Sequence, residues 1–252
     1  MSIVWKIHGR LRNILPKRFI RFFRKIAEIY SDNFWSLKSY SSAGEDIVIR
    51  SLLLRREQMN GNTVLPEKGF YVDVGAFAPK QFSNTYFFYN IGWRGINIDA
   101  APGSMKIFDR IRPRDTNVEA AVSDGEREMR FYTWGTPTVV NTLSAEHAAE
   151  FARRMNKEPE IVVTNTVTLA SLLNRHLPKG CAIDFMNVDA EGCDMEVIRS
   201  NDWAKYRPFL VMVELAEQDC KNMLDSEIVV FLSAQGYKIA SWIYPNIIFE
   251  RK

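Results

Sequence analysis

Three apolar stretches of this 252-residue chain end in carboxylates, which are the side chains here best suited to bind a ligand or to catalyse. Asp73 and the turn residues Gly75 and Ala76 close the first stretch. Asp99 closes the second, close to the roughly 20-residue offset at which a ribose-binding acid follows a nucleotide-binding turn. A carboxylate there can accept hydrogen bonds from both ribose hydroxyls, so the two motifs together predict an adenosine-containing ligand.

The third stretch, Ile183–Gly192, carries Asp189 and Glu191 one residue apart. Such a pair at the ligand-binding edge of a sheet can take a proton from a hydroxyl substrate, orient a positively charged ligand or hold a divalent cation. We expect Asp189 first, and Glu191 second, to act as the catalytic base, and we expect no metal site. The alternatives are a Mg²⁺ ion bound with the help of Glu214, and a helix start at which the two acids only interact with the helix dipole.

The turn after Asp73 lacks the complete glycine pattern of a dinucleotide-binding loop. Phe77 and Lys80 occupy the positions of its second and third glycines. A pyrophosphate could not easily approach that backbone, which favours an adenosine ligand without phosphates over NAD. An NAD-dependent oxidoreductase is therefore the alternative enzyme. A non-catalytic module of the same fold that binds a partner is the alternative outside enzymes.

The elements that must position these residues alternate along the chain. Short β-branched and apolar runs, separated by helical stretches, predict buried parallel strands at Tyr71–Val74, Gly95–Asp99, Asn117–Val122, Ala182–Val188 and Phe209–Glu214. This order predicts an α/β fold with a doubly wound, mostly parallel sheet and helices on both faces. Ligands of such folds bind beyond the carboxyl ends of the strands, where the acids lie.

Residues 133–167 exceed what a crossover between two strands needs, and they predict an inserted region near the site. This region contains the helix-like Glu146–Asn156 and the alternating Ile161–Val167. Within it, we expect His147 to be an exposed helix histidine rather than a substrate contact. The remaining patterns predict helices and a terminal antiparallel pair of strands, at Leu169–His176 and Ile228–Gln235, and at Tyr237–Trp242 and Ile247–Glu250.

The positive charge of the chain is concentrated at its start. The net charge is +3, yet residues 1–25 hold eight Lys and Arg residues and no acid, so the rest of the chain is acidic overall. A nucleic-acid binder would spread positive charge over its folded domain, so we expect no nucleic-acid partner. Apolar residues at helical spacing predict a basic, amphipathic helical extension over residues 1–38. Residues 1–25 would contact an anionic membrane surface, or pack on the main domain or on a partner subunit.

Cysteine usage and hydropathy point to one compartment. The three cysteines are widely spaced, and the chain has neither an apolar run of about 18 residues nor the pattern of a signal peptide. We therefore expect a cytoplasmic protein, or one held peripherally at the inner face of the membrane by its basic extension.

Several short motifs occur together in an order known from one family. They are Tyr40–Asp46, Tyr71–Ala76, Ser83–Thr85, Gly92–Gly95, Glu119–Ser123 and Val188–Gly192. In this order they resemble the FkbM family of S-adenosylmethionine (SAM)-dependent methyltransferases, over roughly residues 40–250.

The resemblance implies a Rossmann-like class I methyltransferase fold over residues 39–252, with SAM as the cofactor. It also implies O-methylation of a small-molecule or glycan acceptor, such as a sugar, a polysaccharide, a glycolipid or a secondary metabolite. Asp73 and Gly75 would line the methionine end of SAM, and Asp99 would hold the ribose. The cofactor-binding residues implied in all are Glu45, Asp73, Gly75, Ala76, Asn84, Asp99, Ala121, Val122 and Asp189, with Ala121 and Val122 beside the adenine, and Glu45 and Asn84 closing the pocket.

Overall fold

The structure of the protein is a computed structural model that describes residues 37–215 and 219–252. The chain divides into two units, residues 1–38 and 39–252, and the second contains all the described helices and strands. The N-terminal extension expected over residues 1–38 lies outside the described residues, apart from Leu37 and Lys38. Within the described ranges, no helix is long and apolar enough to cross a membrane.

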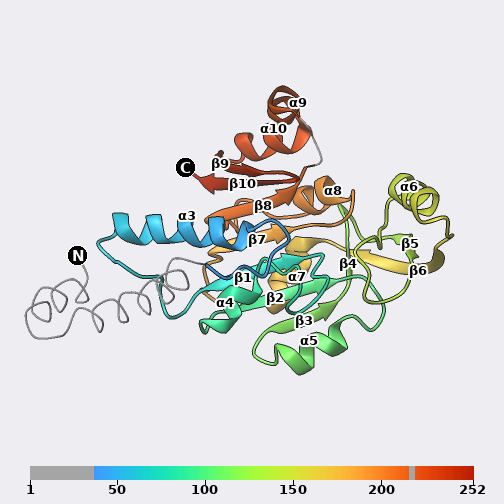
Figure 1. Ribbon diagram of the computed structural model, residues 1–252, viewed down its shortest axis with the longest axis horizontal. Helices are drawn as coiled ribbons and strands as arrows, with labels where there is room; N and C mark the ends of the chain where they lie inside the picture. The colour runs from blue at the N-terminus through green and yellow to red at the C-terminus, as the bar shows by residue number, and fades with distance from the viewer. Residues whose placement is uncertain (1–36, 216–218) are drawn as a thin grey trace, which may run out of the picture. The chain divides into compact units, whose positions relative to one another are not determined.

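Seven strands form the main sheet, in the spatial order β3-β2-β1-β7-β8-β10-β9 (Figure 1). The first five are parallel to one another, and β10 is antiparallel to both β8 and β9. The bounds are β1 Phe70–Val74, β2 Arg94–Asp99, β3 Thr116–Glu119, β7 Phe185–Val188, β8 Leu210–Glu214, β9 Tyr237–Ile243 and β10 Asn246–Arg251. The predicted mostly parallel sheet and its terminal antiparallel pair are confirmed.

Helices cover both faces of this sheet. One face packs against apolar residues of α3 and α4, and the other against those of α7, α8 and α10. The bounds are α3 Glu45–Met59, α4 Tyr86–Asn90, α5 Met105–Ile111, α7 Leu169–His176, α8 Asp194–Arg199, α9 Cys220–Asp225 and α10 Glu227–Ala234. Side-chain hydroxyls cap two of the helix starts, because Thr168 accepts a hydrogen bond from the main chain of α7 and Ser226 from that of α10.

Strand alternation decides which side chains reach each face. In β1, Val72 packs in the core cluster of α7 and α8, whereas Tyr71 packs with α3 and α4. The same alternation places Asp73 on the face of Tyr71. In strand register, Asp73 lies between Asn97 of β2 and Asn187 of β7, and all three are buried. A row of polar side chains therefore crosses the middle of the sheet on this face.

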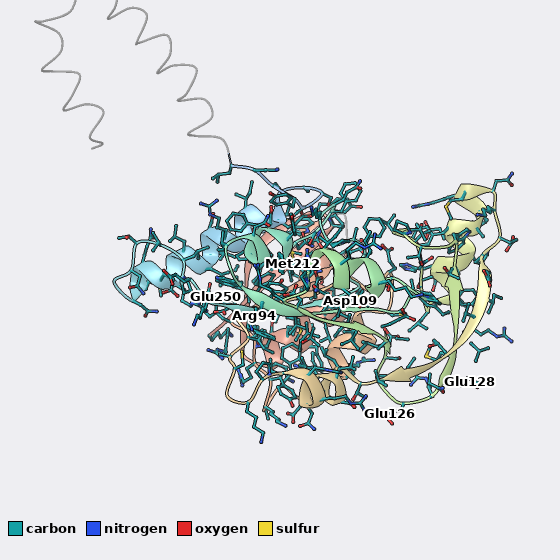
Figure 2. The ribbon with its side chains drawn as sticks, turned by 90° about the horizontal axis from the view of Figure 1, so that it is seen from below. Arg94, Asp109, Glu126, Glu128, Met212 and Glu250 are labelled. Atoms are coloured by element: carbon teal, nitrogen blue, oxygen red, sulfur yellow. The ribbon has the colours of Figure 1, made fainter. Side chains whose placement is uncertain are left out.

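A smaller three-stranded sheet, in the order β4-β6-β5, lies in the region where we expected an insertion. β4 (Ala121–Val122) is parallel to β6 (Glu160–Val167), and β5 (Glu128–Thr133) is antiparallel to β6. The helix α6 (Ala145–Met155) connects β5 to β6. Figure 2 shows this sheet and α6 beyond one end of the main sheet, with Glu128 on β5. β4 and β5 begin before residue 133, whereas α6 and β6 lie within the range 133–167 predicted for the insertion.

One predicted strand is wrong. Asn117–Val122 is not continuous, because β3 and β4 belong to different sheets. The main-chain N–H of Ala120 still donates to the carbonyl oxygen of Asp99 (2.9 Å), as part of the β2–β3 pairing, and the chain then moves to β6, where Ala121 pairs with Thr166. The predicted strand Ala182–Val188 is also shorter than expected, since β7 begins only at Phe185.

Candidate active site

The turn after β1 and the turn after β7 touch at the carboxyl ends of their strands. The strand order reverses between β1 and β7, which is where ligands bind in open α/β sheets. Gly75 has a φ of +81°, and a Cβ at this position would lie 1.7 Å from the main-chain oxygen of Asp189. Only glycine allows so close an approach, so Gly75 brings the two acid-bearing turns together.

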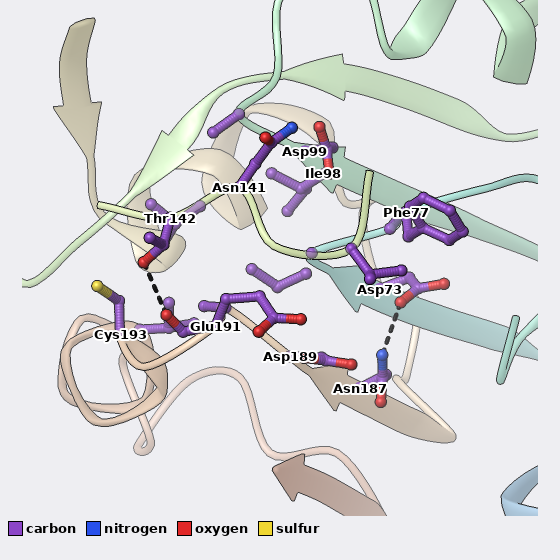
Figure 3. A pocket seen from close by; sticks show the side chains of 18 of the residues that line it. Asp73, Phe77, Ile98, Asp99, Asn141, Thr142, Asn187, Asp189, Glu191 and Cys193 are labelled. Atoms are coloured by element: carbon purple, nitrogen blue, oxygen red, sulfur yellow. Dashed lines mark hydrogen bonds between the residues drawn. The ribbon is translucent and has the colours of Figure 1, made fainter. Parts of the chain in front are cut away.

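A pocket opens at this edge of the sheet (Figure 3). It brings together most of the residues predicted as a site, namely Glu45, Asp73, Gly75, Ala76, Asn84, Asp99, Val122, Asp189 and Glu191. Ala121 does not line it: this residue is buried and pairs with Thr166 of β6, while its neighbours Ala120 and Val122 face the pocket. Among the described residues that line the pocket there is no Lys or Arg, so its charged lining is acidic.

Asp73 is held by hydrogen bonds at both carboxylate oxygens. Asn187 Nδ2 donates to Oδ1 (2.9 Å), and the Thr85 hydroxyl donates to Oδ2 (2.7 Å). Asn84 Nδ2 donates in turn to Asn187 Oδ1 (3.3 Å). Hydrogen bonds to a carboxylate are among the stronger ones, so this buried acid is fixed in one orientation at the pocket.

Asp99 lies partly buried at the end of β2, next to the turn after β1. Its Oδ1 accepts a hydrogen bond from the main-chain N–H of Ala101 (2.8 Å). Burial raises the pKa of Asp99 from 3.8 to about 6. Gly75 and Ala76 both donate main-chain hydrogen bonds to the carbonyl oxygen of Ile98 (2.9 and 3.0 Å). These bonds tie the β1 turn to the strand end that carries Asp99, so one ligand can contact both Asp73 and Asp99.

Three carboxylates gather at the ends of β7 and β8. Asp189, Glu191 and Glu214 each place an oxygen within 4.8 Å of the other two. Oδ1 of Asp189 is buried and has no hydrogen-bond partner. Burial, helped by repulsion from Glu214 and Asp194, raises the pKa of Glu191 from 4.5 to about 8, and burial raises that of Asp189 well above its usual range. Such a cluster can accept a proton, or it can hold a cation that prefers oxygen ligands.

The inserted region packs directly on this cluster. The Thr142 hydroxyl donates to the main-chain oxygen of Glu191 (2.7 Å; Figure 3). Glu191 has a φ of +48°, which is a strained backbone conformation for a residue with a side chain. His147 of α6 is partly buried, with its ring against Gly192 and in edge contact with Phe151. The expectation of an exposed His147 is therefore wrong, because α6 folds back onto the turn after β7.

Glu45 joins the segment before α3 to the sheet. This buried side chain accepts hydrogen bonds from Ala43 N (2.8 Å), from Ser42 Oγ (3.3 Å) and from Asn246 Nδ2 of β10 (2.9 Å). Ser42 and Asn246 line the pocket as well. Glu45 thus fixes two further pocket residues, in addition to lining the pocket itself.

A comparison with protein families identifies the domain that contains this pocket. The family model of the methyltransferase FkbM domain matches residues 73–239, which is more than half of the chain. The chain belongs to the FkbM methyltransferase family. The matched range begins at Asp73 and includes Asp99, Asp189 and Glu191, and the expected family is confirmed. A comparison with curated proteins found no match.

In this FkbM methyltransferase, three side chains that support the pocket were not singled out from the sequence. Thr85 and Asn187 hold Asp73, and Arg112 contacts Thr85 from behind. One signal for Asn187 was present: it is a polar residue inside an otherwise apolar strand, as is Asn97 in β2. Buried polar groups need partners, so such interruptions predict a polar cluster within the core.

Proposed function

We propose that this FkbM methyltransferase uses SAM to methylate a hydroxyl oxygen. One observation carries the proposal: the charged lining of the pocket is acidic. It includes Asp189, whose buried Oδ1 has no hydrogen-bond partner. Burying anionic groups is costly without a compensating positive charge. The sulfonium and ammonium groups of SAM provide that charge, whereas the pyrophosphate of NAD would add further negative charge.

The side chains of the pocket fit the parts of SAM. Asp73 offers a fixed carboxylate to the ammonium group, and Asp99 offers one to the ribose hydroxyls. Val122 and Ile98 provide apolar surface for the adenine, and Glu45 lies among the residues that close the pocket. When bound, SAM supplies an electrophilic methyl group on a positively charged sulfur.

The sheet supports a Rossmann-like class I methyltransferase fold. The chain adds β2 and β3 on one side of the β1–β7 pair and β8 on the other, and all five strands are parallel. This is the doubly wound arrangement. The antiparallel β10 is inserted between β8 and the edge strand β9. Because β2, β1 and β7 are adjacent and parallel, their carboxyl ends lie together at the pocket.

Asp189 is the proton acceptor in this proposal, and Glu191 is the second candidate. A neutral alcohol must lose its proton when its oxygen is methylated, and a positioned carboxylate can take that proton. A base works best when its pKa lies near the operating pH, and burial moves both acids in that direction. Holding the acceptor oxygen in line with the methyl group supplies much of the rate acceleration. In this proposal the loop after β5, whose Thr138 and Asn141 line the pocket, holds the acceptor.

A sugar or glycan hydroxyl is the acceptor that we propose. The acidic lining disfavours acceptors that carry phosphate or carboxylate beside the reacting hydroxyl. Thr138 and Asn141 of the inserted region line the same pocket, and a threonine hydroxyl and a side-chain amide can form hydrogen bonds with sugar hydroxyls.

The exchange Asp189→Asn tests the proposed base. With SAM saturating and a panel of sugars and glycans as acceptors, we expect methylation to slow by about 100-fold or more, the usual worth of a general base. Glu126→Gln, an exposed acid on the inserted region, should keep the rate of the unchanged protein. A normal rate for Asp189→Asn would exclude Asp189 as the base.

Dialysis against EDTA tests the alternative of a metal site, and it should leave the methylation rate unchanged. Loss of the rate after dialysis, with recovery on adding Mg²⁺, would assign Asp189, Glu191 and Glu214 to a metal instead.

A further inference from the structure

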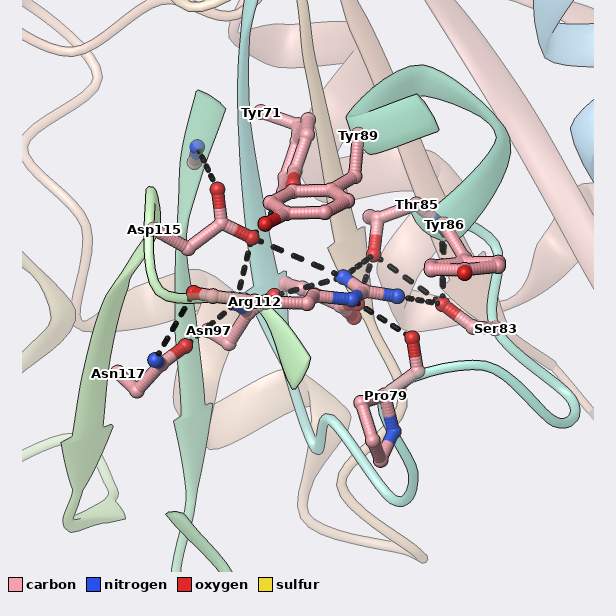
Figure 4. A network of polar contacts seen from close by, with 12 residues as sticks. Tyr71, Pro79, Ser83, Thr85, Tyr86, Tyr89, Asn97, Arg112, Asp115 and Asn117 are labelled. Carbon is pink, nitrogen blue, oxygen red and sulfur yellow. Dashed lines mark hydrogen bonds and ion pairs between the residues drawn. The ribbon is translucent and has the colours of Figure 1, made fainter. Parts of the chain in front are cut away.

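Arg112 is a fully buried cation that the proposed chemistry does not use, and Figure 4 shows the polar groups gathered around it. Its guanidinium donates to Pro79 O (2.7 Å), Ser83 Oγ (2.6 Å), Thr85 Oγ1 (2.7 Å) and Asn97 Oδ1 (3.2 Å). Its guanidinium also forms an ion pair with the buried carboxylate of Asp115 (3.9 Å). Burying a charge costs stability unless its partners are well placed, so these acceptors hold Arg112 in one position.

The contact with Thr85 leads directly to the pocket. A guanidinium can only donate hydrogen bonds, so Thr85 Oγ1 must act as the acceptor towards Arg112. The single hydroxyl proton of Thr85 is then directed to Oδ2 of Asp73, 2.7 Å away. Thr85 is fully buried and Asp73 nearly so, and a buried hydrogen bond of this kind is costly to lose. A chain of two hydrogen bonds therefore joins the Arg112 cation to the Asp73 carboxylate.

We infer that Arg112 is a positioning residue for the amino-acid end of the cofactor, acting through the Thr85 hydroxyl on Asp73. This inference rests on the proposed function, in which Asp73 receives the ammonium group of SAM. Arg112 also fixes Ser83, which lines the pocket beside Asn84, so it anchors the loop before α4 as well as the acid. Lysine cannot take its place, because one ammonium group cannot reach acceptors spread around a planar fork.

Two ligands separate this role from a general structural one. S-adenosylhomocysteine carries the amino-acid portion that would contact Asp73, whereas 5′-methylthioadenosine shares the nucleoside but lacks that portion. Thr85→Val keeps the shape of the side chain and removes its hydroxyl. We expect it to weaken the binding of S-adenosylhomocysteine by about ten- to hundredfold in calorimetric titrations, as expected for a lost hydrogen bond to a charged group. The affinity for 5′-methylthioadenosine should change less than about twofold.

Thr85→Ser is the matched rescue, because it restores the hydroxyl, and its affinity for S-adenosylhomocysteine should return to within about threefold of the original. If Thr85→Val keeps full affinity for S-adenosylhomocysteine, or loses affinity for both ligands equally, the inference is overturned. If the unchanged protein binds neither SAM nor S-adenosylhomocysteine, the proposed function fails instead.

Arg112→Lys tests whether the hydrogen bonds from Arg112 through Thr85 to Asp73 depend on the guanidinium. Arg110→Lys, on the exposed side of α5, is its control. We expect Arg112→Lys to show the same selective loss as Thr85→Val, and Arg110→Lys to behave as the unchanged protein. A folded Arg112→Lys that binds S-adenosylhomocysteine normally would overturn the inference. Where Arg112→Lys does not fold, the Thr85 variants alone decide.

Discussion

Replacing Glu191 by Gln should flatten the dependence of folding stability on pH. Burial and the neighbouring carboxylates raise the pKa of Glu191 from 4.5 to about 8 in the folded protein. Between these two values the folded state keeps a proton that the unfolded state has lost. The free energy of unfolding therefore falls as the pH rises through this window, and the contribution of Glu191 is lost once the pH passes about 8.

The size of the effect follows from proton linkage. One proton held only by the folded state lowers the free energy of unfolding by about 1.4 kcal/mol per pH unit. Glu191 is partly exposed, so solvent screening narrows the pH interval over which this slope applies to about 1.5 units. Between the lower and the higher pH, the free energy of unfolding of Glu191→Gln should therefore rise by about 2 kcal/mol relative to that of the unchanged protein, because glutamine cannot ionise.

Urea unfolding without cofactor, at about pH 5.5 and about pH 7.5, measures this difference. Glu126→Gln serves as the matched control, since Glu126 is an exposed acid outside the cluster (Figure 2). Its stability should follow the curve of the unchanged protein at both pH values. Equal losses of stability for Glu191→Gln and the unchanged protein would refute the argument that Glu191 is protonated in the folded state.

Other changes test further parts of the account. Asp99→Ala should weaken SAM binding by about ten- to hundredfold without unfolding the protein, and unchanged affinity would remove Asp99 from the ribose role. Gly75→Ala should cost about 3 kcal/mol of stability in urea unfolding, because its Cβ would meet the main-chain oxygen of Asp189 and its φ is positive; normal stability would contradict the close contact. Removing residues 1–25, which lie outside the described residues, should abolish sedimentation with anionic liposomes, and persistent binding would exclude this segment as the membrane contact.

Sequence patterns predicted the main sheet because its strands are buried on both faces. The near-continuous apolar runs of β1, β2, β7 and β8 are typical of parallel strands covered by helices, and Leu169–His176 corresponds to α7 as predicted. The pattern failed at Asn117–Val122. Residues on both sides of Ala120 have strand character, and nothing local shows that those before it pair with β2 and those after it with β6.

The candidate site was predictable where it depends on strand ends, and not where it depends on packing between distant segments. Asp73 and Asp189 could be found because each follows an apolar run. The hydrogen bonds from Arg112 to Thr85 and from Thr85 to Asp73 join segments that only the fold brings together, so no local pattern reveals them. The position of His147 depends in the same way on how α6 folds back onto the turn at Gly192.

Calorimetric titration of the purified protein with SAM, and separately with NAD, tests the central claim most directly. The acidic pocket at the ends of β1 and β7 predicts saturable SAM binding and no response to NAD. Binding of NAD would contradict the cofactor assignment in favour of an oxidoreductase, and the absence of binding to either ligand would contradict the proposed cofactor site altogether.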